Sequence, residues 1–114
     1  MRILDYFAMA LVSFIMLAGA SLKLTGNEVA LQSFIDLGLP SWFGTFIGVC
    51  EALGAIGLWL RPTSRLAALG IAIIMCGAIY YHVVFPPIAA GLPAAGVLIA
   101  CFYIIGRKGT GVVG

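Results

Sequence analysis

The sequence predicts an all-α integral membrane protein built as a bundle of four spanning helices. Hydrophobic residues make up 63% of its 114 residues and charged residues only 9%, whereas a soluble domain usually carries about 25% charged residues. The apolar residues fall into four long stretches, and a spanning helix takes about 20 residues. This composition excludes a disordered chain, a nucleic-acid-binding protein and an ordinary water-soluble enzyme. We therefore expect one membrane domain over residues 1–114, in contact with the lipid bilayer.

Turn residues divide the chain into its elements. Gly26 interrupts the first apolar stretch, and the turn Arg61–Arg65 separates the second stretch from the third. Pro86 and Pro87 end the third stretch, because proline cannot continue the hydrogen-bond ladder of a helix. The expected spanning helices cover residues 3–22, 42–60, 66–85 and 89–105.

A shorter element is expected between the first two spans, at residues 28–37. Asn27 stands where a residue can cap its start, and Gly38 and Pro40 close it. Its apolar and polar side chains fall on opposite faces, and it is too short to cross a bilayer. We expect an amphipathic helix that lies at the membrane surface.

The basic residues predict the orientation of the bundle. Five of them fall on one side of the membrane when the chain has four spans: Arg2, Arg61, Arg65, Arg107 and Lys108. Lys23 alone falls on the other side. Because basic loops stay in the cytoplasm, we expect both termini there and the amphipathic helix in the outer loop. Asp5 is expected to pair with Arg61 and Arg65, and the glycine-rich tail at residues 106–114 is expected to be loose.

Small residues recur within the predicted helices, as in Gly44-x-x-x-Gly48 and Gly54-x-x-Gly57. This spacing lets the backbones of two helices approach closely. The pattern is typical of packing within one bundle, and a homodimer surface is the alternative.

Glu51 is the most informative residue, because it stands in the middle of the second predicted span. A carboxylate at that depth costs several kcal/mol to insert, so it has to face the bundle interior and find a partner there. His82 in the third span and Lys23 at the end of the first are the candidate partners. Ala78 shares a helical face with His82, and Tyr81 lies next to it. We expect these five residues to line an intramembrane pocket.

Plainer interpretations stay open for the same side chains. Glu51 can be a hydrogen-bonded carboxyl that holds helices together, and Lys23 can extend to the membrane surface. His82 can be an interfacial residue without a role, and Tyr81 can belong to an aromatic belt. No catalytic residue is assigned. No metal is expected either, because a zinc site usually takes three or four protein ligands.

Several short segments carry a resemblance to a known family. They are Gly19 with Lys23–Gly26, Leu37–Pro40, Gly48–Gly54, Arg61–Arg65 and Ala78–His82. In their order and spacing the chain resembles the DoxX / DoxX-like family of small four-helix membrane proteins. The resemblance implies a multi-pass protein of the bacterial inner membrane, with Lys23, Glu51 and His82 as its polar set. It also implies a link to redox complexes that use quinone for some members, and to assembly factors for distant animal relatives.

Three functions are compatible with these observations. The first is a binding or accessory protein, which can be an assembly factor, whose pocket around Glu51 holds a small amphipathic ligand or a helix of a membrane protein partner. The second is a subunit of a membrane oxidoreductase that uses quinone in sulfur or thiosulfate metabolism. The third is a small proton-coupled exporter; exporters of this size carry their essential glutamate in the first helix, whereas Glu51 falls in the second. We favour the first function.

Overall fold

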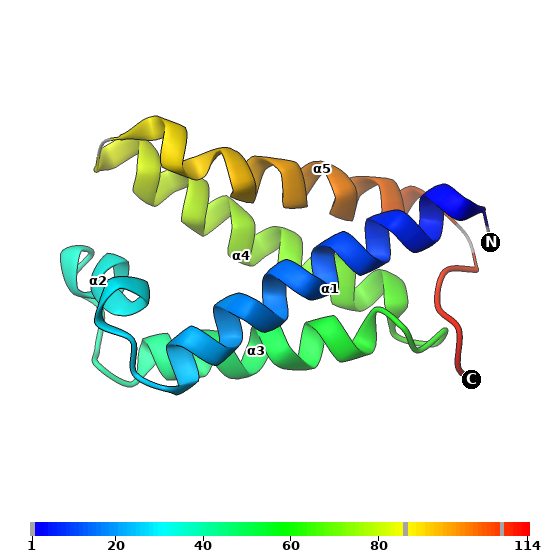
Figure 1. Cartoon of the computed structure of the whole chain (residues 1–114), viewed down its shortest axis with the longest axis horizontal. Helices are drawn as coiled ribbons and strands as arrows, with labels where there is room; N and C mark the ends of the chain where they lie inside the picture. Colours follow the sequence, from blue (N-terminus) through cyan, green and yellow to red (C-terminus); the bar gives the residue numbers. More distant parts are fainter. Residues whose placement is uncertain (1, 86, 108) are drawn as a thin grey trace.

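The computed structural model describes residues 2–85, 87–107 and 109–114, and there the chain is an all-α bundle (Figure 1). Its elements are α1 (Ile3–Leu24), α2 (Glu28–Asp36), α3 (Phe43–Gly57), α4 (Ser64–Val84), the 3₁₀ turn η1 (Ile88–Gly91) and α5 (Leu92–Gly106). The predicted four-helix membrane bundle is confirmed, together with the short helix between its first two spans. Among the described residues, α1, α4 and the segment Ile88–Gly106 are long and apolar enough to cross a membrane, and α3 is a shorter apolar helix.

The four long helices form two pairs that diverge at one end. α1 packs along α3 and also contacts α5, and α4 packs along α5. α3 and α4 share a smaller contact. Figure 1 shows the α1–α3 pair and the α4–α5 pair separating toward the end where α2 lies. This divergence creates the space for the site described below.

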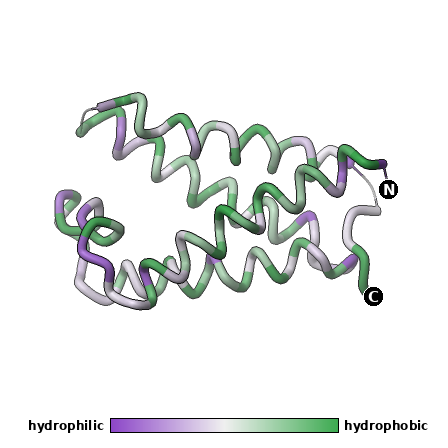
Figure 2. The backbone as a smooth tube through the Cα atoms, in the orientation of Figure 1, coloured by the Kyte–Doolittle hydropathy of each residue, from purple (hydrophilic) through white to green (hydrophobic). Residues whose placement is uncertain are grey.

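The helices are apolar on their outer faces as well as in the core. Met9, Val12 and Met16 of α1 are buried at the centre, while Phe14 of α1 and Ile99 of α5 are largely exposed. Figure 2 shows hydrophobic residues all along the long helices and hydrophilic ones mainly at their ends and on α2. Exposed apolar side chains all around the bundle are suited to lipid and not to water.

Glycines allow the helices to approach within this single bundle. A Cβ atom at Gly54 of α3 would lie 2.9 Å from Cγ1 of Ile71 on α4, and one at Gly48 would lie 3.0 Å from Cβ of Lys23 on α1. At Gly96 of α5, by contrast, a Cβ atom would meet no described atom within 4 Å. Close packing inside the monomer thus accounts for the small residues of α3, and the homodimer stays a prediction.

Most element boundaries lie within three residues of those predicted. Asn27 caps α2, because its Oδ1 accepts a hydrogen bond from the Ala30 N–H at 3.0 Å. α5 begins at Leu92, since η1 occupies the preceding residues, and Pro93 falls in its first turn. Two residues used in the predictions lie outside the described residues: Pro86, which was expected to end the third span, and Lys108, which was counted among the basic residues of the cytoplasmic side.

The C-terminal tail is held in place, so the prediction that it is loose was wrong. The N–H groups of Val112 and Val113 donate to the carbonyl of Trp59 at 2.8 and 3.0 Å, and the Arg61 N–H donates to the Val113 carbonyl at 2.8 Å. Thr110 is only 2% exposed. This pairing also explains why α3 ends at Gly57, before the predicted residue 60: the backbone beyond it bonds to the tail.

Asp5 pairs with the end of α5, so the prediction of Arg61 and Arg65 as its partners was wrong. Its carboxylate accepts hydrogen bonds from the Tyr103 hydroxyl at 2.6 Å and from Arg107 Nε at 3.0 Å. The cause is the helix order, which sets the start of α1 beside the end of α5. A hydrogen bond to the Asp5 carboxylate raises the pKa of Arg107. Arg65 instead donates to the Ile105 carbonyl at 2.9 Å.

Candidate functional site

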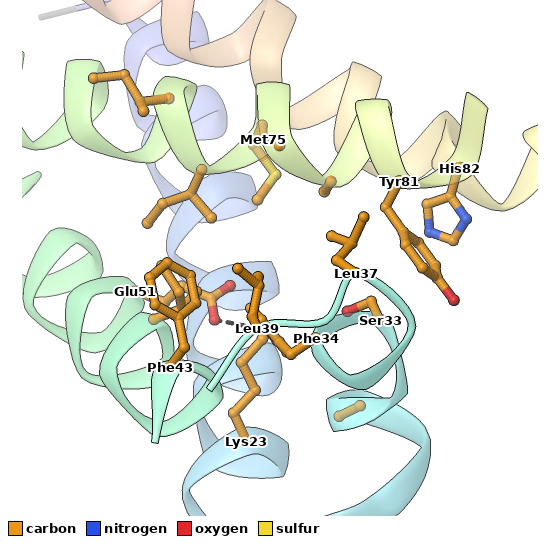
Figure 3. Close-up of a pocket in the computed structure, with 16 residues that line it drawn as sticks. Lys23, Ser33, Phe34, Leu37, Leu39, Phe43, Glu51, Met75, Tyr81 and His82 are labelled. Carbon is orange, nitrogen blue, oxygen red and sulfur yellow. Dashed lines mark ion pairs between the residues drawn. The ribbon is translucent and has the colours of Figure 1, made fainter. Parts of the chain in front are cut away.

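A cavity of about 440 Å³ occupies the space between the diverging helix pairs (Figure 3). Its walls come from α1, α2, α3 and α4 and are mostly apolar. The five residues proposed from the sequence all line it: Lys23, Glu51, Ala78, Tyr81 and His82. We call this space the main cavity. What it binds stays a prediction.

A buried ion pair between α1 and α3 forms one side of the main cavity. Nζ of Lys23 lies 2.8 Å from Oε1 of Glu51, and their side chains are 16% and 3% exposed. Lys23 therefore turns into the bundle and not toward the membrane surface. Figure 3 shows the two side chains pointing toward each other. A charge in an apolar interior is tolerated when it is paired in this way.

Two glycines make room for this pair. A Cβ atom at Gly19 of α1 would lie 3.2 Å from Oε2 of Glu51, and one at Gly48 of α3 would crowd the Lys23 stem at 3.0 Å. Both contacts are tighter than a side chain normally accepts. The local sequence therefore fixes the geometry of the pair: small residues on both helices let the long Lys23 side chain lie between them.

Tyr81 and His82 enter the main cavity from α4. The Tyr81 hydroxyl donates a hydrogen bond to Asp36 of α2, and the Tyr81 ring stacks on Phe85 at a centroid distance of 5.0 Å. His82 packs against Gly91, where a Cβ atom would lie 3.1 Å from the His82 Cβ. In the described part of the chain its Nδ1 atom is buried without a hydrogen-bond partner. Figure 3 shows His82 well separated from Glu51, so the cavity lies between them.

α2 covers the main cavity, a role that its sequence pattern does not predict. Phe34 and Leu37 line the cavity, together with the Ser33 hydroxyl. Every residue of α2 keeps some exposure. Asp36 at its end accepts hydrogen bonds from Tyr81 and from Gln32 Nε2, and these lower the pKa of Asp36, the Tyr81 bond most of all. The apolar face of residues 28–37 was the available signal for this role, and the place of this helix at the membrane surface stays a prediction.

The main cavity combines apolar walls with a few polar groups, which is the usual chemistry of a small-molecule site. Lys23 supplies an ammonium donor and Glu51 a carboxylate acceptor, while Ser33 and His82 add further polar atoms. Among the described residues, no cluster of three His, Cys, Asp or Glu side chains is arranged to hold a metal ion. The arrangement is therefore suited to binding a molecule that is mainly apolar and polar at one end.

The model of the DoxX-like family matches residues 7–105. This range includes all five residues that the sequence proposed for the pocket. Comparisons with curated proteins and with solved structures find no match.

Proposed function

Because the chain belongs to the DoxX-like family of membrane proteins, we propose that it binds a small amphipathic molecule in the main cavity. The single observation that supports this proposal most is the Lys23–Glu51 ion pair at the wall of an apolar cavity, where the Lys23 side chain is 16% exposed and the Glu51 side chain 3%. Lys23 is therefore the more accessible polar group of the pair.

The size of the main cavity favours a small molecule over a partner helix. Its volume of about 440 Å³ falls within the range of ~300–1,000 Å³ typical of ligand pockets. A helix with its side chains is roughly 10 Å across, and α2 occupies the end through which it would enter. The proposal assigns the protein to the binding and accessory proteins of the membrane.

We further infer that the protein lies in a bacterial inner membrane with both termini in the cytoplasm. Arg2, Arg61, Arg65 and Arg107 lie at the end of the bundle where the chain begins and ends, and Lys23 lies toward the other. Basic residues concentrate on the cytoplasmic side. The main cavity then belongs to the outer half of the membrane. Labelling of either terminus in intact cells, compared with lysed cells, tests this orientation.

Filling the main cavity tests the binding function. Gly77 of α4 lines the cavity, and a Cβ atom there meets no described atom within 4 Å, so Gly77→Leu places an apolar side chain at the cavity wall without a clash at its Cβ. We expect small molecules that co-purify with the wild-type protein in mild detergent to be depleted about tenfold, which corresponds to ~1.4 kcal/mol. Native mass spectrometry and analysis of the extracted molecules give the readout.

Gly96→Leu is the matched control. Gly96 is also an exposed helical glycine with open space around its Cβ position, but it lies on α5. Both substitutions raise helix propensity equally, so only occupancy of the main cavity differs. Equal amounts of bound small molecule in Gly77→Leu, Gly96→Leu and wild-type protein would contradict the proposal.

A further inference from the structure

A second cavity of about 320 Å³ lies between α3 and α4. Its described lining consists of apolar and small side chains, among them Cys50 and Gly54 of α3 and Gly70 of α4. We call it the side groove. It extends along α4 from Ala67 to Ile74, about 10 Å at a rise of 1.5 Å per residue. A groove of this length and chemistry fits a hydrocarbon chain and offers nothing to a polar headgroup.

The side groove adjoins the main cavity. Ile47, Ile73 and Ile74 line both spaces, so the two lie on either side of the same side chains. α3 and α4 also share less contact than the other neighbouring spans. Ile73 beside the groove is largely exposed on the outer face of the bundle. A molecule in the bilayer therefore meets the groove directly from the side.

The polar groups of the main cavity favour an uncharged head. The formal charges of Lys23 and Glu51 cancel, so a charged head would bring a net charge into an apolar space, which is costly unless it is paired. An ammonium group has three donors, and among the described residues Lys23 forms one ion pair, the Nζ–Oε1 contact with Glu51. A hydroxyl head can accept a hydrogen bond from Lys23, whose side chain is 16% exposed, while Glu51 behind it is 3% exposed. In the described part of the chain, Nδ1 of His82 is a second polar atom at the cavity wall without a hydrogen-bond partner.

We propose that the ligand is an uncharged single-chain amphiphile, whose head lies beside Lys23 and Glu51 and whose chain lies in the side groove. The molecule enters sideways from the bilayer between α3 and α4. This inference rests on the proposed binding function and adds the class of ligand and its path.

Cysteine modification gives a direct test of the chain position. Cys50 lines the side groove, whereas Cys76 lies on the exposed face of α4 and Cys101 is buried. The purified protein in micelles is treated with N-phenylmaleimide in the presence of dodecan-1-ol, dodecanoic acid or dodecylamine, and each thiol is followed by mass spectrometry. We expect dodecan-1-ol to slow the modification of Cys50 severalfold and to leave Cys76 unchanged, with weaker protection by the acid and the amine.

The same experiment tests whether the head of the ligand is uncharged. Stronger protection by the acid or by the amine than by the alcohol would overturn the uncharged head. Equal rates at Cys50 with and without each of the three probes would overturn the chain position.

A second variant separates this inference from the proposed function. A Cβ atom at Gly70 meets no described atom within 4 Å, so Gly70→Leu fills the side groove as Gly77→Leu fills the main cavity. We expect both variants to weaken binding of labelled dodecan-1-ol about tenfold, and Gly96→Leu to bind as the wild type does. Loss in Gly77→Leu with full binding in Gly70→Leu would overturn the side groove alone. Full binding in both variants would overturn the proposed function as well.

Discussion

Lys23 and Glu51 join α1 to α3 through a 2.8 Å contact between Nζ and Oε1. The pair lies in the interior of the bundle, in a protein of which only 9% of the residues are charged. Each of these side chains alone would be unfavourable in an apolar bundle. Gly19 and Gly48 provide the space in which they meet. The pair is therefore a property of two helix faces together, and removing either charge leaves the other without its partner.

The first prediction concerns the stability of this pair. Lys23→Met and Glu51→Gln should each lower the free energy of unfolding, by up to ~3–5 kcal/mol as for other buried ion pairs that lose one partner. The double variant should be more stable than the sum of the single losses predicts, because no unpaired charge remains. Reversible unfolding in mixed micelles gives the coupling energy, and strictly additive losses would show that the two side chains act independently.

The sequence predicts the helices and the polar residues well, because both depend on local properties. Hydropathy locates the spans, and a carboxylate inside one of them has to turn inward, so Glu51 is found without any knowledge of its neighbours. The partner of Asp5 depends instead on which helix ends lie side by side. The sequence of residues 3–22 does not predict that α1 packs against α5, which it does in the structure. The choice of Arg107 over Arg61 thus comes from the order of the helices.

Two further features escaped prediction for the same reason. The apolar face of α2 is compatible with both a bilayer surface and a protein cavity, and the cavity that it covers exists because the helix pairs diverge. The tail at residues 109–114 has no helical pattern, and its order comes from backbone hydrogen bonds to Trp59 and Arg61. Hydrogen bonds between backbone atoms of distant segments depend little on the identity of the side chains, so the sequence does not predict them.

The second prediction is that α2 loosens at low pH. The hydrogen bonds to Asp36, from Tyr81 above all, lower its pKa in the folded protein below the ordinary value of 3.8. Because the folded pKa is the lower one, the contact stabilises the fold fully above about pH 4, and this contribution is lost as the pH falls through the folded value. Hydrogen exchange of the α2 amides, followed from pH 6 downward, should show protection decreasing below about pH 4 after correction for the intrinsic rate.

Tyr81→Phe should produce the same loosening of α2 at neutral pH, since it removes the donor and keeps the ring. Tyr80→Phe is the control, because Tyr80 is an exposed neighbour on the same helix. Equal α2 protection in Tyr81→Phe, Tyr80→Phe and wild-type protein would mean that α2 is held by its other contacts alone.

The third prediction concerns the cluster that joins the two ends of the chain. Asp5 is 1% exposed and accepts hydrogen bonds from the Arg2 N–H, the Tyr103 hydroxyl and Arg107. Asp5→Asn keeps the size of the side chain but removes its charge and one acceptor oxygen. The melting temperature should fall clearly, and Tyr103→Phe should lower it less. Arg61→Gln, which leaves the Asp5 cluster intact, should change it little; a similar fall in that variant would argue against a specific role for the cluster.

The fourth prediction concerns Gly111 in the ordered tail. Its φ of +105° is a conformation that residues with a Cβ rarely adopt, and a Cβ atom there would lie 2.7 Å from both N and Cα of Arg61. Gly111→Ala should therefore release the tail from the end of α3. Hydrogen exchange of the Val112 and Val113 amides, which donate to Trp59, should then become nearly as fast as in an unfolded chain.

Gly109→Ala separates backbone strain from this collision. Gly109 also has a positive φ, +79°, but no described atom lies within 4 Å of its Cβ position. Its substitution should cost only the left-handed conformation, ~1–2 kcal/mol, and should leave the Val112 and Val113 amides largely protected. If the two variants lost protection to the same extent, the cost of the left-handed backbone conformation alone would explain the loss in Gly111→Ala. The collision of a Cβ atom with Arg61 would then contribute nothing.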